Sequence, residues 1–238
     1  NHSIADAVAF AIKTPVGTVI MTGDFKIDPT SADGMMDLAR LGELGNQGVL
    51  ALLADSTNVE RAGYTPSENV VAESLDRQFK NCDQRIIIIQ SVISTAQRYG
   101  RKVAVTGRSM ENMLKVAQEL GYLKVKPGTI VDLGSIKSIP KNKLVIVSTG
   151  SQGENMSALY RMAFSTHKQV EITSGDRIII SASAIPGNEK AVSRIINELY
   201  RKGADVVYEK REGLHVSGHA CQEELKIIHA LVKPKFFL

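Results

Sequence analysis

Two residues near the start of the chain, His2 and Asp24, have side chains of the types that can bind divalent metal ions. Asp24 follows the apolar, β-branched run Thr18–Thr22, which is typical of a strand that presents a carboxylate at its C-terminal end. Imidazole nitrogen and carboxylate oxygen both coordinate divalent ions, and an aspartate can bridge two of them. The spacing alone favours a simpler interpretation, a surface histidine and a capping aspartate, because the chain lacks two histidines at the spacing of a zinc motif.

A second group of polar residues contains Asp55 and two closely spaced histidines. Asp55-Ser56-Thr57-Asn58 directly follows the apolar run Val49–Ala54, and by itself it is more typical of a capped turn than of a catalytic group. In His215-Val216-Ser217-Gly218-His219, an extended backbone would place two imidazoles and a hydroxyl on one face. Such a face could bind a phosphate and exchange a proton with a leaving oxygen. A polar edge strand with a bulge at Gly218 fits the same string equally well.

Two glycine-bearing loops each lie between an expected strand and an expected helix. They are Ser148–Glu154 and Ser183–Glu189. Backbone N–H groups in such loops can bind phosphate, and a plain tight turn is the alternative. Neither loop has the Walker A pattern or the dinucleotide-binding pattern.

The elements that must position these residues alternate between short apolar strands and amphipathic helices. Strands are expected at Thr18–Thr22, Val49–Ala54, Arg85–Ile89, Lys102–Thr106, Leu144–Ser148, Arg177–Ser181 and Ala204–Tyr208. Helices are expected at Ala5–Lys13, Ser109–Leu120, Glu189–Lys202 and Gln222–Val232. This alternation predicts an α/β fold with a mainly parallel sheet flanked by helices, whose functional groups gather at the carboxyl ends of the strands. Residues 67–212 form a self-contained alternation, so they are predicted to be a domain inserted between residues 1–66 and 213–238.

The amino-acid composition limits the classes of protein to which the chain can belong. The chain has 238 residues, 43% of them hydrophobic and 23% charged, as in ordinary globular α/β proteins. Its net charge of +4 fits a polyanionic partner without establishing one, and the absence of Trp excludes widespread base stacking. Cys82 and Cys221 lie far apart, which favours free thiols in the cytoplasm. No apolar run is long enough for a membrane span, and no signal peptide is expected.

Taken in order, the polar segments resemble the bacterial ribonuclease J family of metallo-β-lactamase-fold nucleases with an inserted β-CASP domain. The matching segments are Asn1-His2-Ser3-Ile4, Thr22-Gly23-Asp24-Phe25-Lys26, Asp55-Ser56-Thr57-Asn58, Gly107-Arg108-Ser109-Met110, Ser148–Glu154, Ile185-Pro186-Gly187-Asn188-Glu189, His215–His219 and Lys233-Pro234-Lys235-Phe236-Phe237. Each segment alone is weak evidence for the resemblance, but the set occurs in the order of the family and spans nearly the whole chain. The resemblance implies that residues 67–212 are the β-CASP domain, between strips of the αββα metallo-β-lactamase domain.

The resemblance also implies a reaction and roles for individual residues. The family cleaves RNA phosphodiester bonds, as a 5′-to-3′ exonuclease and as an endonuclease, with two zinc or manganese ions. By this likeness His2 and Asp24 are metal ligands, Asp55 supports the metal site, and His219 assists departure of the leaving group. His215, Val216, Ser217 and Gly218, together with His219, look like the pocket for a substrate phosphate. The implied partners are single-stranded 5′-monophosphorylated RNA, further copies in a dimer or tetramer, and other RNA-decay proteins, all in the cytoplasm and none in a membrane.

Several expected family features are absent from these 238 residues. An H-x-H-x-D-H motif should precede Asn1, a P-x-H-G-E-like segment should follow Phe237, and a segment resembling F-A-S-N-x-H-R should lie between Ile88 and Ile89. We therefore expect an incomplete chain that holds metal weakly or not at all, and that is inactive alone. Three other interpretations remain open: a non-catalytic RNA-binding or dimerisation module, a β-CASP nuclease acting on DNA or RNA 3′ ends, and a catalytically silent α/β domain.

Overall fold

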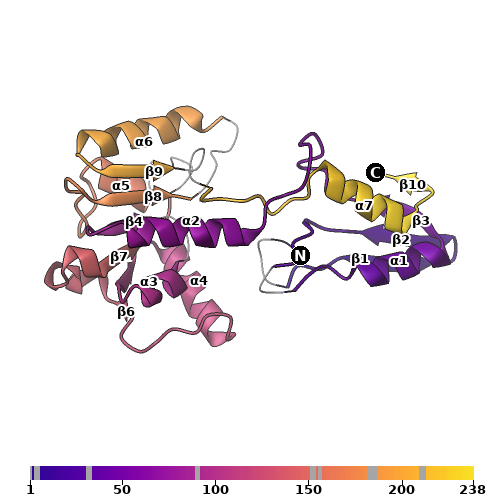
Figure 1. Cartoon of the computed structure of the whole chain (residues 1–238), viewed down its shortest axis with the longest axis horizontal. Helices are drawn as coiled ribbons and strands as arrows, with labels where there is room; N and C mark the ends of the chain where they lie inside the picture. The colour runs from indigo at the N-terminus through magenta and orange to yellow at the C-terminus, as the bar shows by residue number, and fades with distance from the viewer. Residues whose placement is uncertain are drawn as a thin grey trace. The chain divides into compact units, whose positions relative to one another are not determined.

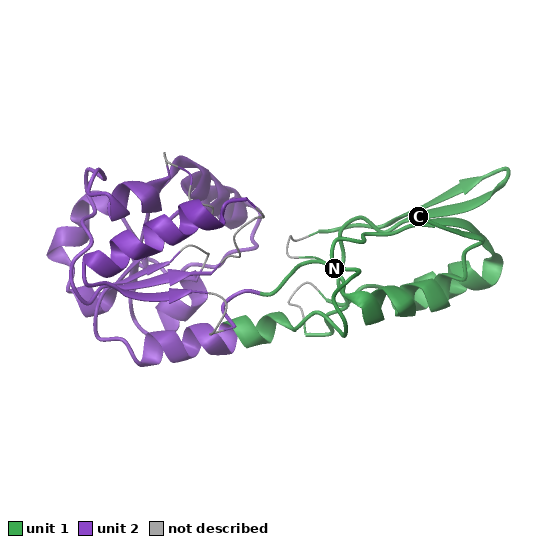
Figure 2. Cartoon of the chain, turned by 90° about the horizontal axis from the view of Figure 1, so that it is seen from above, with its two compact units in different colours: residues 1–71, 216–238 green, residues 72–215 purple. Residues whose placement is uncertain are grey.

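The computed structural model describes residue 2, residues 6–30, 34–88, 92–150, residue 154, and residues 157–181, 187–208 and 213–238. The chain divides into two compact units, coloured separately in Figure 2. Unit 1 consists of residues 1–71 and 216–238, and unit 2 consists of residues 72–215. The second unit is therefore inserted into the first in the order of the chain.

Unit 1 contains a four-stranded sheet in the order β1-β2-β3-β10. The strands are β1 (Phe10–Thr14), β2 (Gly17–Met21), β3 (Val49–Leu53) and β10 (Phe236–Phe237). β1 and β2 form an antiparallel hairpin, whereas β3 runs parallel to both β2 and β10. β2 and β3 end next to each other, so the residues that follow them, including Asp24 and Asp55, emerge at the same edge of the sheet.

The helix expected at Ala5–Lys13 is wrong, because the described part of this stretch ends in strand β1. Its alanines favour a helix by local propensity. The chain instead turns back after Thr14, whose hydroxyl donates to the carbonyl of Gly17 at 2.6 Å, and β1 pairs with β2 along its whole length. Gly17 has φ of +144°, and a Cβ there would lie 2.8 Å from that of Leu50. Tertiary pairing therefore overrides a weak local preference.

Two helices, α1 (Leu38–Gln47) and α7 (Gln222–Val232), cover one side of this sheet (Figure 2). Their apolar side chains form one buried core with the sheet, which includes Ile20, Leu41, Leu44, Leu52, Leu225, Ile228 and Val232. The two helices approach closely at Gly45, where an added Cβ would lie 2.0 Å from the carbonyl oxygen of Leu231. The C-terminal end of α7 is thereby packed directly against α1.

Unit 2 contains a six-stranded, wholly parallel sheet in the order β6-β5-β7-β4-β8-β9. Its strands are β4 (Ile86–Ile88), β5 (Lys102–Val105), β6 (Ile130–Val131), β7 (Leu144–Val147), β8 (Arg177–Ile180) and β9 (Asp205–Tyr208). The central strands β4 and β7 are buried at every residue, as expected for a parallel sheet covered on both faces.

The helices of unit 2 connect these parallel strands (Figure 1). They are α2 (Glu68–Lys80), which begins in unit 1, α3 (Ile93–Arg98), α4 (Arg108–Glu119), α5 (Ala158–Ala163) and α6 (Glu189–Arg201), with 3-10 turns at Leu133–Ser138 and Lys141–Lys143. The predicted α/β class and the mainly parallel sheet are confirmed. Within the described residues, no helix combines the length and apolar character needed to cross a membrane.

Candidate metal centre

Three side chains from distant parts of the chain meet in unit 1. His2, Asp24 and His219 each offer a ligand atom, and these atoms all lie within 4.8 Å of one another. Nε2 of His2 is 3.8 Å from Oδ2 of Asp24, and the rings of His2 and His219 stand edge to face with centroids 5.0 Å apart. The sequence interpretation treated His2 and Asp24 as ligands and His219 as a separate catalytic group. The structure brings all three together.

The outer nitrogen of each histidine is already held by a hydrogen bond. Nδ1 of His2 donates to the carbonyl oxygen of Gly218 at 2.7 Å, and Nδ1 of His219 donates to Oδ2 of Asp55 at 2.7 Å. Metal-binding histidines usually have such a second partner, which fixes the tautomer and the orientation of the ring. In both residues Nδ1 is thus engaged, and Nε2 of His2 is the nitrogen that approaches Asp24.

Asp55 follows β3, and its carboxylate is nearly inaccessible to solvent. The backbone N–H of Asp55 donates to the hydroxyl of Thr22, and Oδ1 accepts the backbone N–H of Thr57 at 2.9 Å. Burial alone would raise the pKa of Asp55, but hydrogen bonds from Thr57 and the interaction with His219 outweigh it and lower the pKa. Asp55 is therefore a charged, fixed partner for the His219 imidazole.

The chain bends at Gly218 and His219, and no strand is assigned to His215–His219. The hydroxyl oxygen of Ser217 accepts the backbone N–H of His219 at 3.1 Å, a local bond that competes with a strand. The side-chain amide of Asn58 donates both to that hydroxyl, at 2.8 Å, and to the carbonyl of His219, at 3.1 Å. His215 is exposed and belongs to unit 2, while Val216 is half-buried.

The chemistry of the cluster suits one divalent ion. Bonds of about 2.1 Å to nitrogen and oxygen place neighbouring ligand atoms about 3.4 Å apart in a tetrahedral site. The separation of 3.8 Å between His2 and Asp24 exceeds this only slightly, and the Asp24 side chain is 62% exposed, so it can move inward. Within the part of the chain that the structure describes, no second group of three such residues is present.

The segment that follows Asp24 is anchored by a buried ion cluster. Lys26 and Asp28 are both buried, with Nζ of Lys26 placed 3.6 Å from Oδ2 of Asp28 and 2.9 Å from Oε1 of Glu68. Oδ2 of Asp28 also accepts the backbone N–H of Glu68, at the start of α2, and Oδ1 accepts two bonds from Thr30. Burial would raise the pKa of Asp28, but these hydrogen bonds and the charge of Lys26 lower it to about 2.

Replacing Asp28 with Asn is expected to remove an acid-labile part of the free energy of unfolding. The folded-state pKa lies below the unfolded value of about 3.9, so Asp28 stabilises the fold fully above that value. This contribution, about 2 kcal/mol, is lost as the pH falls from about 4 to about 2. Urea unfolding of wild type and Asp28→Asn, from about pH 7 to about pH 3, measures it. Glu73→Gln, an exposed change on α2, is the control. Parallel pH curves for wild type and Asp28→Asn would contradict the assignment.

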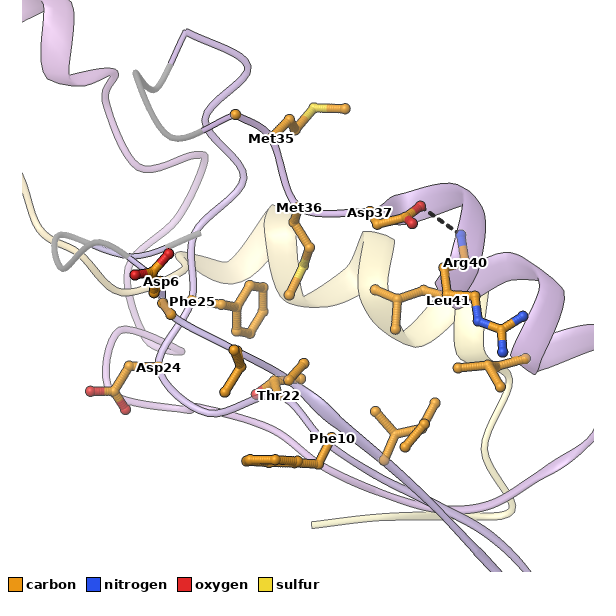
Figure 3. Close-up of a pocket in the computed structure, with 17 residues that line it drawn as sticks. Asp6, Phe10, Thr22, Asp24, Phe25, Met35, Met36, Asp37, Arg40 and Leu41 are labelled. Atoms are coloured by element: carbon orange, nitrogen blue, oxygen red, sulfur yellow. Dashed lines mark hydrogen bonds between the residues drawn. The ribbon is translucent and has the colours of Figure 1, made fainter. Parts of the chain in front are cut away.

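An apolar cavity of about 610 Å³ lies beside the cluster, between the β1–β2 hairpin and α1. Its lining includes Phe10, Phe25, Met36 and Leu41, and Figure 3 shows the carboxylate of Asp24 turned away from the last two. The cavity therefore shares the Asp24 backbone with the cluster but does not receive its charged group.

The phosphate-loop candidates of unit 2 follow strands β7 and β8 in the sequence, but half of their residues fall outside the described part. In Ser148–Glu154 the described residues are Ser148, Thr149, Gly150 and Glu154, and in Ser183–Glu189 they are Gly187, Asn188 and Glu189. Gly107 and Gly150 both have φ of +110°, and a Cβ on Gly107 would lie 2.9 Å from the hydroxyl of Thr149. The loops after β5 and β7 are thus in close contact.

Two contributors to the site were missed by sequence reasoning. Asn58 belongs to the segment Asp55–Asn58 but was given no role, and Thr65 was not singled out. The hydroxyl of Thr65 donates to the carbonyl of His219 at 2.7 Å. Both residues act on a backbone carbonyl far away in sequence, and no local spacing reveals such a bond.

Comparison with known proteins agrees with this arrangement. The family model "Ribonuclease J, beta-CASP domain" matches residues 80–199. Proteins named Ribonuclease J from Thermus thermophilus, Helicobacter pylori and Synechocystis are 49%, 47% and 45% identical over the whole chain. The chain spans only 43%, 36% and 39% of their respective lengths.

The alignment with the Thermus protein runs over 248 positions, more than the 238 residues of the chain, so the relative has additional residues within the matched stretch. A shortfall was expected between Ile88 and Ile89, and Ile89 lies outside the described residues. The family model, the identities and the parallel sheet of unit 2 agree with one another. The chain belongs to the ribonuclease J family.

Proposed function

We propose that the protein hydrolyses RNA phosphodiester bonds with the help of divalent metal ions, and that His2 and Asp24 hold one of these ions. The observation that supports this most strongly is the meeting of His2, Asp24 and His219, with the outer nitrogen of each imidazole already bonded. A surface histidine and a capping aspartate would have no reason to converge with a third such residue from the far end of the chain.

The partners of the two histidines suggest different roles for them. His2 donates from Nδ1 to a backbone carbonyl, which orients the ring and leaves Nε2 as the atom available to a metal ion. His219 donates to a carboxylate, which stabilises positive charge on the ring when Nε2 also carries a proton. We therefore assign proton donation to the leaving oxygen to His219, with Asp55 holding its tautomer. A bound divalent ion would supply Lewis-acid stabilisation of the phosphate and lower the pKa of the attacking water.

The phosphate of the substrate is proposed to bind at His215, Val216, Ser217, Gly218 and His219. Ser217 and His219 are fixed by the Asn58 amide, so their polar groups are held in place before substrate arrives. A two-ion mechanism needs more protein ligands than His2 and Asp24 supply. We propose that other residues complete the site, and that the 238-residue chain alone binds zinc or manganese weakly and does not cleave RNA.

The same proposal covers the domains, the partners and the compartment. Residues 67–212 are assigned to the β-CASP domain, and residues 1–66 and 213–238 to the metallo-β-lactamase domain. The proposed substrate is single-stranded, 5′-monophosphorylated RNA. The enzyme cleaves it both from the 5′ end and internally, during RNA processing and decay. It acts as a dimer or tetramer, together with other RNA-decay proteins. The net positive charge and the two buried, free cysteines support a polyanionic substrate and a reducing, cytoplasmic compartment.

Cleavage assays with the full-length gene product test this function. We expect manganese- or zinc-dependent hydrolysis of a 5′-monophosphorylated single-stranded RNA, slower cleavage of the 5′-triphosphorylated form, and little cleavage of DNA of the same sequence. Salt-dependent RNA binding without turnover would support a binding module instead. Faster cleavage of the DNA would point to a nuclease of another specificity.

A further inference from the structure

Glu224 is a charged residue whose side chain is completely buried in unit 1. Burying a carboxylate is costly unless hydrogen bonds replace its water, and an apolar residue at the same place would often be at least as stable. Glu224 lies in the first turn of α7, among the apolar residues that pack this helix on the sheet. Its presence there calls for an explanation in terms of its partners.

The Glu224 carboxylate accepts three backbone N–H bonds from three separate segments of the chain. Oε1 accepts from Ile27 at 2.8 Å, and Oε2 accepts from Thr65 at 2.7 Å and from Cys221 at 2.8 Å. The bond to Cys221 is the reciprocal half of a helix capping box and is local. The other two bonds cross 197 and 159 positions of sequence, and a helix cap requires neither of them.

Each of these three segments carries a residue of the candidate site. Ile27 follows closely after Asp24, Thr65 lies in the loop that begins with Asp55 and Asn58, and Cys221 follows closely after His219. The hydroxyl of Thr65 adds a direct contact, because it donates to the carbonyl of His219 at 2.7 Å. One buried carboxylate thus connects the backbones that present the metal ligand Asp24 and the proton donor His219.

We propose that Glu224 is a positioning residue for the metal and proton-transfer groups, acting through the backbone of Ile27, Thr65 and Cys221 and through the Thr65 hydroxyl. This inference rests on the proposed function, since it assigns the positioned groups their roles. A residue needed only for the start of α7 would require the Cys221 bond alone. The two long-range bonds serve the relative placement of the loops, as the outer partners of metal ligands do.

The test is Glu224→Gln in the 238-residue chain, with Glu223→Gln as the matched control. Glu223 lies in the same helical turn, but its side chain is partly exposed and paired with Lys226. Its change to Gln removes the same charge from the helix and leaves the three hydrogen bonds of Glu224 in place. Gln keeps the size of Glu224 but places an amide N–H₂ group against a backbone N–H. Thermal unfolding shows whether each variant folds. Two-dimensional NMR follows the Nδ1–H signal of His219 and the backbone amides of Ile27, Thr65 and Cys221. Electron paramagnetic resonance measures the affinity for Mn²⁺.

In Glu224→Gln we expect a folded chain in which the backbone amide that faces the new N–H₂ group loses protection from hydrogen exchange and the His219 Nδ1–H signal shifts. Affinity for Mn²⁺ should fall by about 10- to 100-fold, the usual effect of losing an outer partner of a metal ligand. Glu223→Gln should match wild type in every measurement. A folded Glu224→Gln chain with an unchanged His219 signal and unchanged Mn²⁺ affinity would overturn the proposal.

Two further outcomes are also decisive. If the wild-type 238-residue chain binds no Mn²⁺, as its incomplete ligand set allows, the His219 signal alone decides the positioning role: a shift supports it, and no shift overturns it. If Glu224→Gln does not fold, Thr65→Val and Thr65→Ser replace it. Valine removes the hydroxyl bond to His219 and serine keeps it, so only Thr65→Val should shift the His219 signal. An unshifted signal in Thr65→Val would overturn the proposal.

Discussion

Replacing His219 with Ala in the full-length gene product is expected to lower kcat/KM for RNA cleavage by at least about 100-fold, the usual contribution of a positioned general acid. Its Nδ1 is held by Asp55, and the residue lies in the cluster that also contains His2 and Asp24. Because His219 is assigned to proton transfer, Mn²⁺ affinity should change much less than activity. Asp55→Asn should give a smaller loss, since the amide oxygen can still accept from Nδ1 but no longer stabilises positive charge on the ring.

His229→Ala is the matched control for this experiment. His229 is an exposed imidazole on α7 in the same unit, and its ring packs against Phe237 rather than against the cluster. The His229→Ala variant should cleave RNA at the wild-type rate. Activity of His219→Ala close to that of His229→Ala would contradict the catalytic assignment. An equal, large loss of activity and Mn²⁺ affinity in His219→Ala would show instead that His219 is a metal ligand.

Replacing Asp24 with Asn is expected to lower Mn²⁺ affinity by more than about 100-fold. Losing an outer partner of a metal ligand already costs about 10- to 100-fold, and Asp24 supplies the one negative charge among the three groups of the cluster. Isothermal titration calorimetry on the full-length gene product measures the change. The free energy of unfolding without metal should stay nearly constant, because the Asp24 side chain is 62% exposed.

Glu43→Gln is the control for Asp24→Asn. Glu43 is an exposed acid on α1 that pairs with Arg40, so its replacement removes one negative charge from the same unit without touching the cluster. If both variants weaken Mn²⁺ binding equally, the effect is one of net charge. If neither variant weakens it, the ion binds elsewhere.

Most strands of the fold were predictable because they are short apolar runs rich in β-branched residues. Ile86–Ile88 and Leu144–Val147, for example, are apolar at every position, as central strands of a parallel sheet must be. The hairpin strand Phe10–Thr14 was predicted as a helix because its alanines and mixed polarity contain no such run. Its pairing with Gly17–Met21 decides its conformation, and that information is not local.

The candidate site was predictable in its residue types but not in its grouping. His2, Asp24, Asp55 and His219 were all singled out, yet His219 was expected on an extended face with His215. A bond from the His219 backbone to the Ser217 hydroxyl turns the chain there, and Asn58 and Thr65 hold that turn from elsewhere in the sequence. Glu224 was hidden within an amphipathic helix, where a glutamate in the first turn is ordinarily a cap.

The most direct test of the central claim, that His2, Asp24 and His219 surround a catalytic metal ion, is anomalous diffraction from manganese-soaked crystals of the full-length gene product. We predict a manganese peak within bonding distance of Nε2 of His2 and an oxygen of Asp24, with His219 beside it and still bonded to Asp55. Manganese peaks that all lie away from His2 and Asp24, in crystals of a preparation that cleaves RNA, would contradict the account.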